Sequence, residues 1–128
     1  MAGIQTSLAP WLSVQSTKKA VAFYKEAFSA VETYRLEDNE GKAVVKLSIN
    51  GAEFWLGDSG NSNNVPENIG GGTVRMVLTV DDPDAFFIKA INAGATEIFP
   101  VCEEYGWLLG RCVDPFGLHW EIGKPLHK

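Results

Sequence analysis

The chain has 128 residues, of which 45% are hydrophobic and 21% are charged, the composition of a single globular domain with a packed core. Its formal net charge is −5 and its longest basic run is the pair Lys18 and Lys19. Nucleic acid and anionic membranes are therefore not expected partners, because both require a concentrated positive field. The segment Met1–Trp11 has no positive stretch followed by a long apolar run, so no secretion signal is predicted. Cys102 and Cys112 fit neither a disulfide framework nor a paired zinc motif, which favours reduced thiols in a cytoplasmic protein.

The first half of the chain predicts a strand, a helix and three further strands. Leu8–Val14 is predicted to be a strand, in which Trp11 and Ser13 alternate with Leu12 and Val14. Ser16 and Thr17 are suitable N-cap residues, and the apolar side chains that follow recur at helical spacing. These side chains are Ala20, Phe23, Tyr24, Ala27 and Phe28. Three strands are predicted next, with Asn50-Gly51 as a hairpin turn between the last two: Val31–Leu36, Ala43–Ile49 and Ala52–Leu56.

The second half repeats this order after a polar, glycine-rich segment. We interpret that segment, at about residues 59–72, as a linker between a first repeat at about residues 5–58 and a second at about residues 73–123. Its triple glycine is followed by neither a lysine nor a predicted helix, so a phosphate-binding loop is not expected. A helix is predicted to begin at Asp81 or Asp82 and to end at Gly94. The strands of this repeat are predicted at Thr73–Val80, Glu97–Val101, Gly106–Val113 and Leu118–Ile122.

The two halves also align directly with one another. At an offset of 65 residues Ala20–Glu32 lies over Ala85–Glu97, and at an offset of 66 Asn50–Gly57 lies over Phe116–Gly123. Each half is therefore predicted to be a βαβββ unit. The whole chain is predicted to be one α+β domain in which eight strands form a curved mixed sheet with the helices outside. A duplicated unit of this kind places any pocket between its halves.

Two segments resemble the vicinal oxygen chelate superfamily, which includes glyoxalase I, bleomycin-resistance proteins, fosfomycin-resistance enzymes and extradiol dioxygenases. Ala22–Glu32 (AFYKEAFSAVE) is similar to the helix and following strand of that superfamily, and Val113–Ile122 (VDPFGLHWEI) is similar to its final turn and strand. The resemblance covers nearly the whole chain. It implies the paired βαβββ fold and a homodimer, but one scaffold hosts isomerases, transferases, dioxygenases and metal-free binding proteins, so it does not choose an activity.

In metal-dependent members of the superfamily, the metal ligands come from the first and last strands of the two units. The resemblance places Ala9, Trp55, Arg75 and Glu121 at those positions. Only Glu121 can serve as a ligand there, because alanine and tryptophan offer none and arginine stays cationic. We therefore expect no metal cofactor, and we predict that Arg75 and Glu121 form an ion pair in its place.

Strand alternation extends the expected cup, because residues two apart share a face. If the ligand face of the superfamily points into the cup, the lining is aromatic with a few polar groups, which is typical of a small-molecule site. The expected lining residues are Ala9, Trp11, Glu53, Trp55, Arg75, Val77, His119 and Glu121. By resemblance, the loop before the penultimate strand borders the cup, so Tyr105 and Trp107 are candidates to cover a ligand.

The sequence leaves several functions open. The first hypothesis is a metal-free binding protein of the bleomycin-resistance type, which sequesters a planar ligand without turnover. The second is a metal-dependent lyase, isomerase, transferase or dioxygenase that uses Glu121 and His119 with Glu53 and Glu103 as further ligands. The third is a cup filled by its own aromatic side chains. The acidic chain suits a cationic ligand whereas Arg75 suits a carboxylate or phosphonate, and the sequence does not decide between them.

Overall fold

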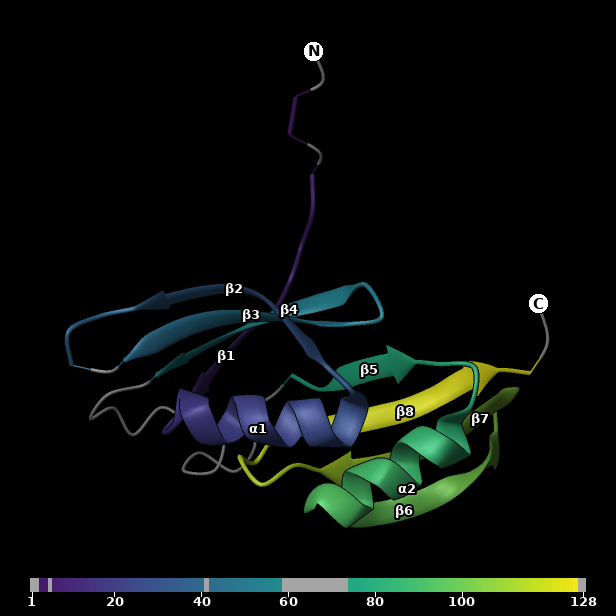
Figure 1. The fold of residues 1–128 in the computed structure, drawn as a ribbon. Coiled ribbons are helices and arrows are strands. Elements are labelled where there is room, and N and C mark those ends of the chain that lie inside the picture. Colours follow the sequence, from purple (N-terminus) through teal and green to yellow (C-terminus); the bar gives the residue numbers. More distant parts are fainter. Residues whose placement is uncertain (1–2, 5, 41, 59–73, 127–128) are drawn as a thin grey trace.

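The computed structural model describes residues 3–4, 6–40, 42–58 and 74–126, so the predicted linker lies outside the described residues. Within them the chain forms the two predicted βαβββ units (Figure 1). The first unit contains β1 (Trp11–Val14), α1 (Thr17–Phe28), β2 (Val31–Glu37), β3 (Ala43–Ile49) and β4 (Ala52–Asp58). The second contains β5 (Met76–Thr79), α2 (Pro83–Ala93), β6 (Thr96–Glu104), β7 (Trp107–Val113) and β8 (His119–Pro125). Neither helix is long and apolar enough to cross a bilayer.

Local sequence signals account for where both helices begin. The Ser16 side chain accepts a hydrogen bond of 3.2 Å from the backbone N–H of Lys19 at the start of α1. Asp82 does the same for Ala85 at the start of α2, where Pro83 occupies the first turn. The predicted apolar stripe of α1 is buried, with Ala20, Phe23, Tyr24, Ala27 and Phe28 all in the core.

The eight strands are divided between two four-stranded mixed sheets. Their orders are β1-β4-β3-β2 and β5-β8-β7-β6, and in each sheet the first pair is parallel and the other pairs are antiparallel. β1 and β5 begin later than predicted, at Trp11 instead of Leu8 and at Met76 instead of Thr73. Ala9 and Arg75 therefore lie just before these strands and outside the regular sheet pairing.

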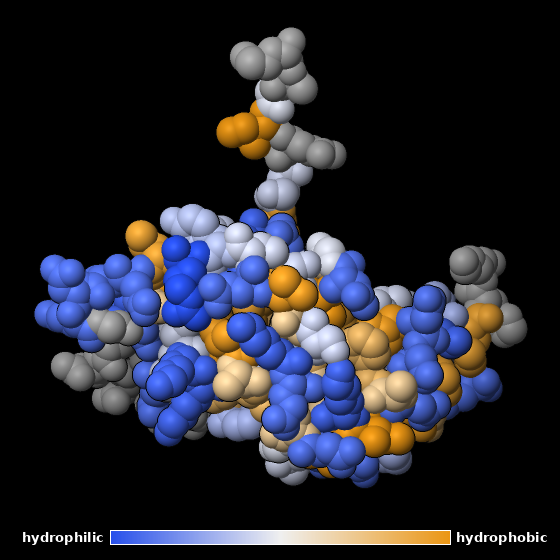
Figure 2. All heavy atoms as spheres, viewed as in Figure 1, coloured by the Kyte–Doolittle hydropathy of each residue, from blue (hydrophilic) through white to orange (hydrophobic). Residues whose placement is uncertain are grey.

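One hydrophobic core joins the two units. Alternate side chains of both sheets enter it with the apolar faces of α1 and α2. Phe54 of β4 and Trp120 of β8 meet there with ring centroids 5.7 Å apart, and both rings contact Tyr24 of α1. The opposite faces of the two sheets therefore point away from this core. The side of the molecule that carries the helices is mostly hydrophilic, with scattered apolar side chains (Figure 2).

A buried hydrogen-bond network crosses the boundary between the units. Asp114 is 4% exposed and accepts hydrogen bonds from the Tyr24 hydroxyl and, at 2.8 Å, from the indole N–H of Trp120. Its other carboxylate oxygen accepts the backbone N–H groups of Phe116 and Leu118, each at 2.9 Å. Four donors thus compensate the desolvation of one carboxylate, as buried charged groups require. Tyr24 lies in the first unit and Asp114 in the second, so the network connects the units by chemistry as well as by packing.

Candidate functional site

The uncovered face of the first sheet carries a row of large side chains, one from each strand. Backbone pairing places Trp11 beside Trp55, Trp55 beside Lys46, and Lys46 beside Tyr34. These four residues are called the aromatic row. The two indoles are stacked with centroids 6.3 Å apart and planes inclined by 22°, and the Tyr34 ring meets Trp55 edge-on at 5.6 Å.

Lys46 and Glu53 add charge to the aromatic row. The Lys46 ammonium nitrogen lies 4.9 Å from the Trp55 ring centroid and 3.2 Å from a carboxylate oxygen of Glu53. Trp11 is 53% exposed and Tyr34 is 47% exposed. The row is therefore a large apolar surface left open to solvent, with one internally neutralised charge pair on it.

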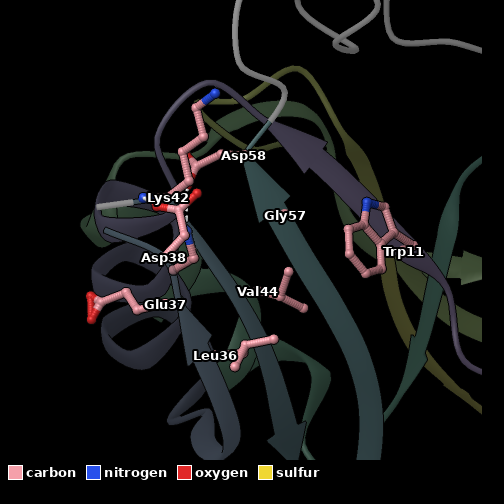
Figure 3. A pocket seen from close by; sticks show the side chains of 9 residues that line it. Trp11, Leu36, Glu37, Asp38, Lys42, Val44, Gly57 and Asp58 are labelled. Atoms are coloured by element: carbon pink, nitrogen blue, oxygen red, sulfur yellow. Dashed lines mark hydrogen bonds between the residues drawn. The ribbon is translucent and has the colours of Figure 1, made fainter. Parts of the chain in front are cut away.

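A groove of about 390 Å³ lies beside Trp11 on this face (Figure 3). Leu36, Val44 and Gly57 contribute its apolar surface, and Asp58 stands at its end. Gly57 is required by close approach, because a Cβ atom there would lie 2.2 Å from Cζ2 of Trp11. The Asp58 carboxylate already accepts the backbone N–H groups of Thr17 and Ala43. The groove is therefore apolar where the Trp11 indole borders it.

The uncovered face of the second sheet carries the equivalent row, but with charged side chains. Pairing places Val77 beside Glu121, Glu121 beside Arg111, and Arg111 beside Phe99. These four residues are called the charged row. The offsets that align the repeats pair Trp55 with Glu121 and Lys46 with Arg111, so the two rows occupy matching places in the two units.

The predicted ion pair between Arg75 and Glu121 is present, with Nε of Arg75 2.8 Å from Oε2 of Glu121. The Arg75 side chain is 49% exposed and that of Glu121 is 16% exposed, so the pair is open to solvent on one side. Its contribution to stability is then at most about 1 kcal/mol, less than a fully buried pair would give.

His119 lies at the start of β8 next to the charged row. Its Nδ1 accepts a hydrogen bond of 3.2 Å from Nε of Arg111, so the neutral ring carries its proton on Nε2. Burial, together with the nearby Arg111 guanidinium, lowers the pKa of His119. The imidazole is therefore held neutral and presents an N–H group.

The candidate residues predicted from the sequence fall into two separate groups. Trp11, Glu53 and Trp55 lie on the first sheet, whereas His119 and Glu121 lie on the second. Since the uncovered faces point away from the shared core, a single chain does not bring the two groups together. Of the remaining candidates, Ala9 precedes β1, and Arg75 and Val77 lie beside Glu121. Tyr105 lies in the turn before β7 and is 95% exposed, and Trp107 at the start of β7 is partly buried.

The sequence analysis missed Tyr34, Lys46 and Arg111. Tyr34 and Lys46 come from β2 and β3, the second and third strands of the first unit, and Arg111 comes from β7, the third strand of the second unit. The resemblance to the superfamily pointed only to the first and last strand of each unit. The signal was nevertheless present in the strand Ala43–Ile49 (AVVKLSI), where the one charged residue, a lysine, stands in a mostly apolar run. The repeat offset of 65 then leads from Lys46 to Arg111.

The donor set does not fit the metal site that the superfamily implies. Trp55 and Arg75 stand at two of the four ligand positions, and Glu121 is already bound by the Arg75 guanidinium. Within the described parts of the chain, no three His, Cys, Asp or Glu side chains are grouped so that they could hold a metal ion.

Comparison with known proteins gives relatives that the chain matches over most of their length. The chain is 37% identical over 132 residues to the uncharacterized protein Rv0887c of Mycobacterium tuberculosis, covering 98% of this chain and 78% of the relative. It is 31% identical over 121 residues to the uncharacterized Arabidopsis thaliana protein At5g48480, covering 85% of this chain and 72% of that protein. The chain belongs to the same family as these proteins. No protein-family model matches it.

Solved structures agree with this assignment. The crystal structure of At5g48480 superposes with a TM-score of 0.67 at 28% identity, covering 94% of this chain and 98% of that one. The fosfomycin resistance protein FosX of Listeria monocytogenes, a member of the vicinal oxygen chelate superfamily, superposes with a TM-score of 0.74 at 16% identity, covering 96% and 95%. At that identity the likeness to FosX concerns the fold alone. The chain therefore has the fold of the vicinal oxygen chelate superfamily.

Proposed function

We propose that the protein is a metal-free small-molecule binding protein of the bleomycin-resistance type. The observation that carries this proposal is the ion pair between Arg75 and Glu121, which occupies the single carboxylate available at the expected metal positions. The aromatic row offers stacking surfaces, and the charged row with His119 offers hydrogen-bonding groups. Such a combination orients a planar ligand that has a polar end. The function is then sequestration, with no bond made or broken.

The complete cup in this proposal is shared between two copies of the chain. Each chain exposes both rows on faces that point away from its own core, with Trp11, Tyr34, Leu36 and Val77 between 47% and 60% exposed. A second copy that sets its charged row opposite the aromatic row of the first would cover these apolar side chains. A symmetric pair would contain two such cups, because the contact is repeated by the twofold axis.

Mixing two defective variants tests the shared cup. A panel of planar aromatic compounds is first screened by tryptophan emission, and the best binder becomes the probe. Trp55→Ala, in the aromatic row, and His119→Ala, next to the charged row, should each weaken binding of this probe. A mixed dimer contains one cup with both rows intact, so mixing the variants should recover binding that neither shows alone. If no compound changes the emission, or if mixing recovers nothing while sedimentation shows mixed dimers, the proposal fails.

Metal content separates this function from the metal-dependent alternative. Protein incubated with zinc, nickel, manganese, iron and cobalt salts and then desalted should retain less than about a tenth of an equivalent of each. Glu53→Gln is a suitable comparison variant, since Glu53 also carries a carboxylate but is paired with Lys46. Near-stoichiometric metal that is lost in Glu121→Gln and kept in Glu53→Gln would support an enzyme instead.

A further inference from the structure

Arg111 is a cation on the charged row whose natural counter-ion is taken by another residue. It lies in the middle of β7 and is partly buried, with Glu121 directly across the strand pair. Glu121, however, is bound by Arg75 at 2.8 Å. Within the described parts of the chain, no carboxylate oxygen lies within 4.0 Å of the Arg111 guanidinium. A partly buried charge without a counter-ion is unfavourable, which indicates that a further anion belongs there.

The first repeat provides an internal comparison for this site. Lys46 stands at the place that matches Arg111, and Glu53 at the place that matches His119. Lys46 is neutralised by Glu53 at 3.2 Å, whereas Arg111 meets the neutral ring of His119 at the same separation of 3.2 Å. The same contact is thus charge-balanced in one repeat and not in the other. Around the charged row, the guanidinium groups of Arg75 and Arg111 face the one carboxylate of Glu121, which leaves one positive charge there in a chain of net charge −5.

Apart from the Glu121 carboxylate, which is bound by Arg75, the side chains at this point offer donors. A guanidinium has five N–H groups and no acceptor, and only Nε of Arg111 has a hydrogen bond within the described structure, to His119. Because His119 uses Nδ1 as an acceptor, its Nε2–H group remains as a donor. A group that accepts two or more hydrogen bonds and carries one negative charge matches this pair, and a carboxylate has that chemistry.

We propose that Arg111 and His119 form the anion-binding end of the cup and that the ligand is a planar aromatic monocarboxylate. The inference rests on the proposed binding function and adds to it the class of ligand. Phe99, the neighbour of Arg111 on β6, and the aromatic row of the partner copy provide surfaces for the ring. The single uncompensated charge favours a monoanion over neutral and cationic molecules of the same shape.

Three probes of one shape test the charge preference: 2-naphthoate, 2-naphthamide and 2-naphthylmethylamine, titrated by calorimetry into the wild-type protein. 2-Naphthoate should bind most tightly. Arg111→Gln should weaken 2-naphthoate by about tenfold or more, the loss of a charge-assisted hydrogen bond, and leave 2-naphthamide unchanged. Arg35→Gln is the matched control, because Arg35 is paired with Glu32 and lies on β2 away from the charged row, and it should change nothing. Arg111→Lys keeps a cation and serves if the glutamine variant does not fold.

The pKa of His119 gives a second measurement, which ligand binding would not change if Arg111 and His119 had a purely structural role. A bound carboxylate next to the ring stabilises the imidazolium, so saturating 2-naphthoate should raise the pKa of His119 followed by NMR, and 2-naphthamide should not. Binding of the amide or amine as tightly as the acid, or an affinity for the acid that does not depend on Arg111, overturns the inference and leaves the proposed function in place. If none of the three probes and no compound of the wider planar panel binds, both the inference and the proposed function are wrong.

Discussion

The hydroxyl of Tyr24 can be removed without disturbing the packing around it, which makes Tyr24→Phe a sharp test of the network between the repeats. The ring contacts Phe28, Phe54 and Trp120, and all of these contacts survive the substitution. What is lost is one hydrogen bond to Asp114, a carboxylate that is 4% exposed. Water cannot readily replace the donor at so buried a site.

The expected loss of unfolding free energy is about 1.5–3 kcal/mol, the range for a buried hydrogen bond to a charged group. Burial, and to a lesser degree the Asp114 carboxylate, raise the pKa of Tyr24 well above its usual value. The phenol therefore remains protonated and donates throughout the range in which proteins are stable. For a domain of this size each kcal/mol lowers the melting temperature by about 3–5 °C.

Urea unfolding followed by circular dichroism measures this loss, with Tyr34→Phe as the control. The Tyr34 ring packs against Trp55, but it is 47% exposed, and its hydroxyl has no hydrogen bond within the described structure. The control should change stability by less than about 0.5 kcal/mol, as surface substitutions do. Equal effects of the two substitutions, at unchanged m-value, would refute the idea that the buried bond to Asp114 stabilises the joined repeats.

Three further predictions concern other sites. Gly57→Ala should displace the Trp11 indole, whose Cζ2 atom lies 2.2 Å from the added Cβ position, and should shift tryptophan emission and weaken probe binding; unaltered emission would contradict the packing. In the native state, the exposed Cys102 should react with iodoacetamide at mildly alkaline pH while Cys112 should not, because burial raises the pKa of Cys112 to about 11; mass spectrometry of the labelled peptides decides this. His119, assigned with His119→Gln, should titrate by NMR below the ordinary histidine pKa. The unfolded chain then binds a proton at His119 more readily than the folded protein does. The contribution of His119 to the free energy of unfolding is therefore fully present above the ordinary histidine pKa and is lost as the pH falls through the lowered pKa of the folded state. A His119 pKa at or above the ordinary value would contradict this.

Much of the fold follows from short-range signals in the sequence. The caps at Ser16 and Asp82 fix where the helices begin, and Asn50-Gly51 forms the predicted hairpin with both residues at positive φ, 52° and 98°. The repeat offsets predict that the second unit copies the first. The caps and the hairpin depend on residues close together in the chain, and the repeat is visible when the two halves are aligned. These features can therefore be predicted from the sequence alone.

The arrangement of the two uncovered faces did not follow from the sequence. Alternation in a strand tells which side chains share a face, but it does not tell which other element that face meets. The contact between Phe54 and Trp120 places both sheets around one core, and this contact joins positions far apart in the chain. For that reason, Trp55 and Glu121 were predicted in one pocket, whereas a single chain holds them on separate faces.

The ion pair was predicted and Arg111 was not, for a related reason. Arg75 and Glu121 stand at positions that the resemblance names, so their opposite charges on neighbouring strands could be matched directly. The contact between Arg111 and His119 depends on the register between β7 and β8, which turn geometry sets and sequence boundaries determine only to within a few residues.

The Asp114 network shows how two copies of one unit have become different from each other. The offset of 65 that matches Lys46 with Arg111 places Ile49 at the position of Asp114, and the hairpin turn of the first repeat is supported instead by Ser48, whose hydroxyl accepts the backbone N–H of Gly51. Asp114 supports the equivalent turn with one oxygen and reaches Tyr24 with the other, while the position that matches Tyr24 in the second repeat is Lys89. Donor and acceptor have thus been divided between the halves. A chain built from two identical first repeats would lack the Asp114 carboxylate, and one built from two identical second repeats would lack the Tyr24 hydroxyl, so the buried network requires both halves.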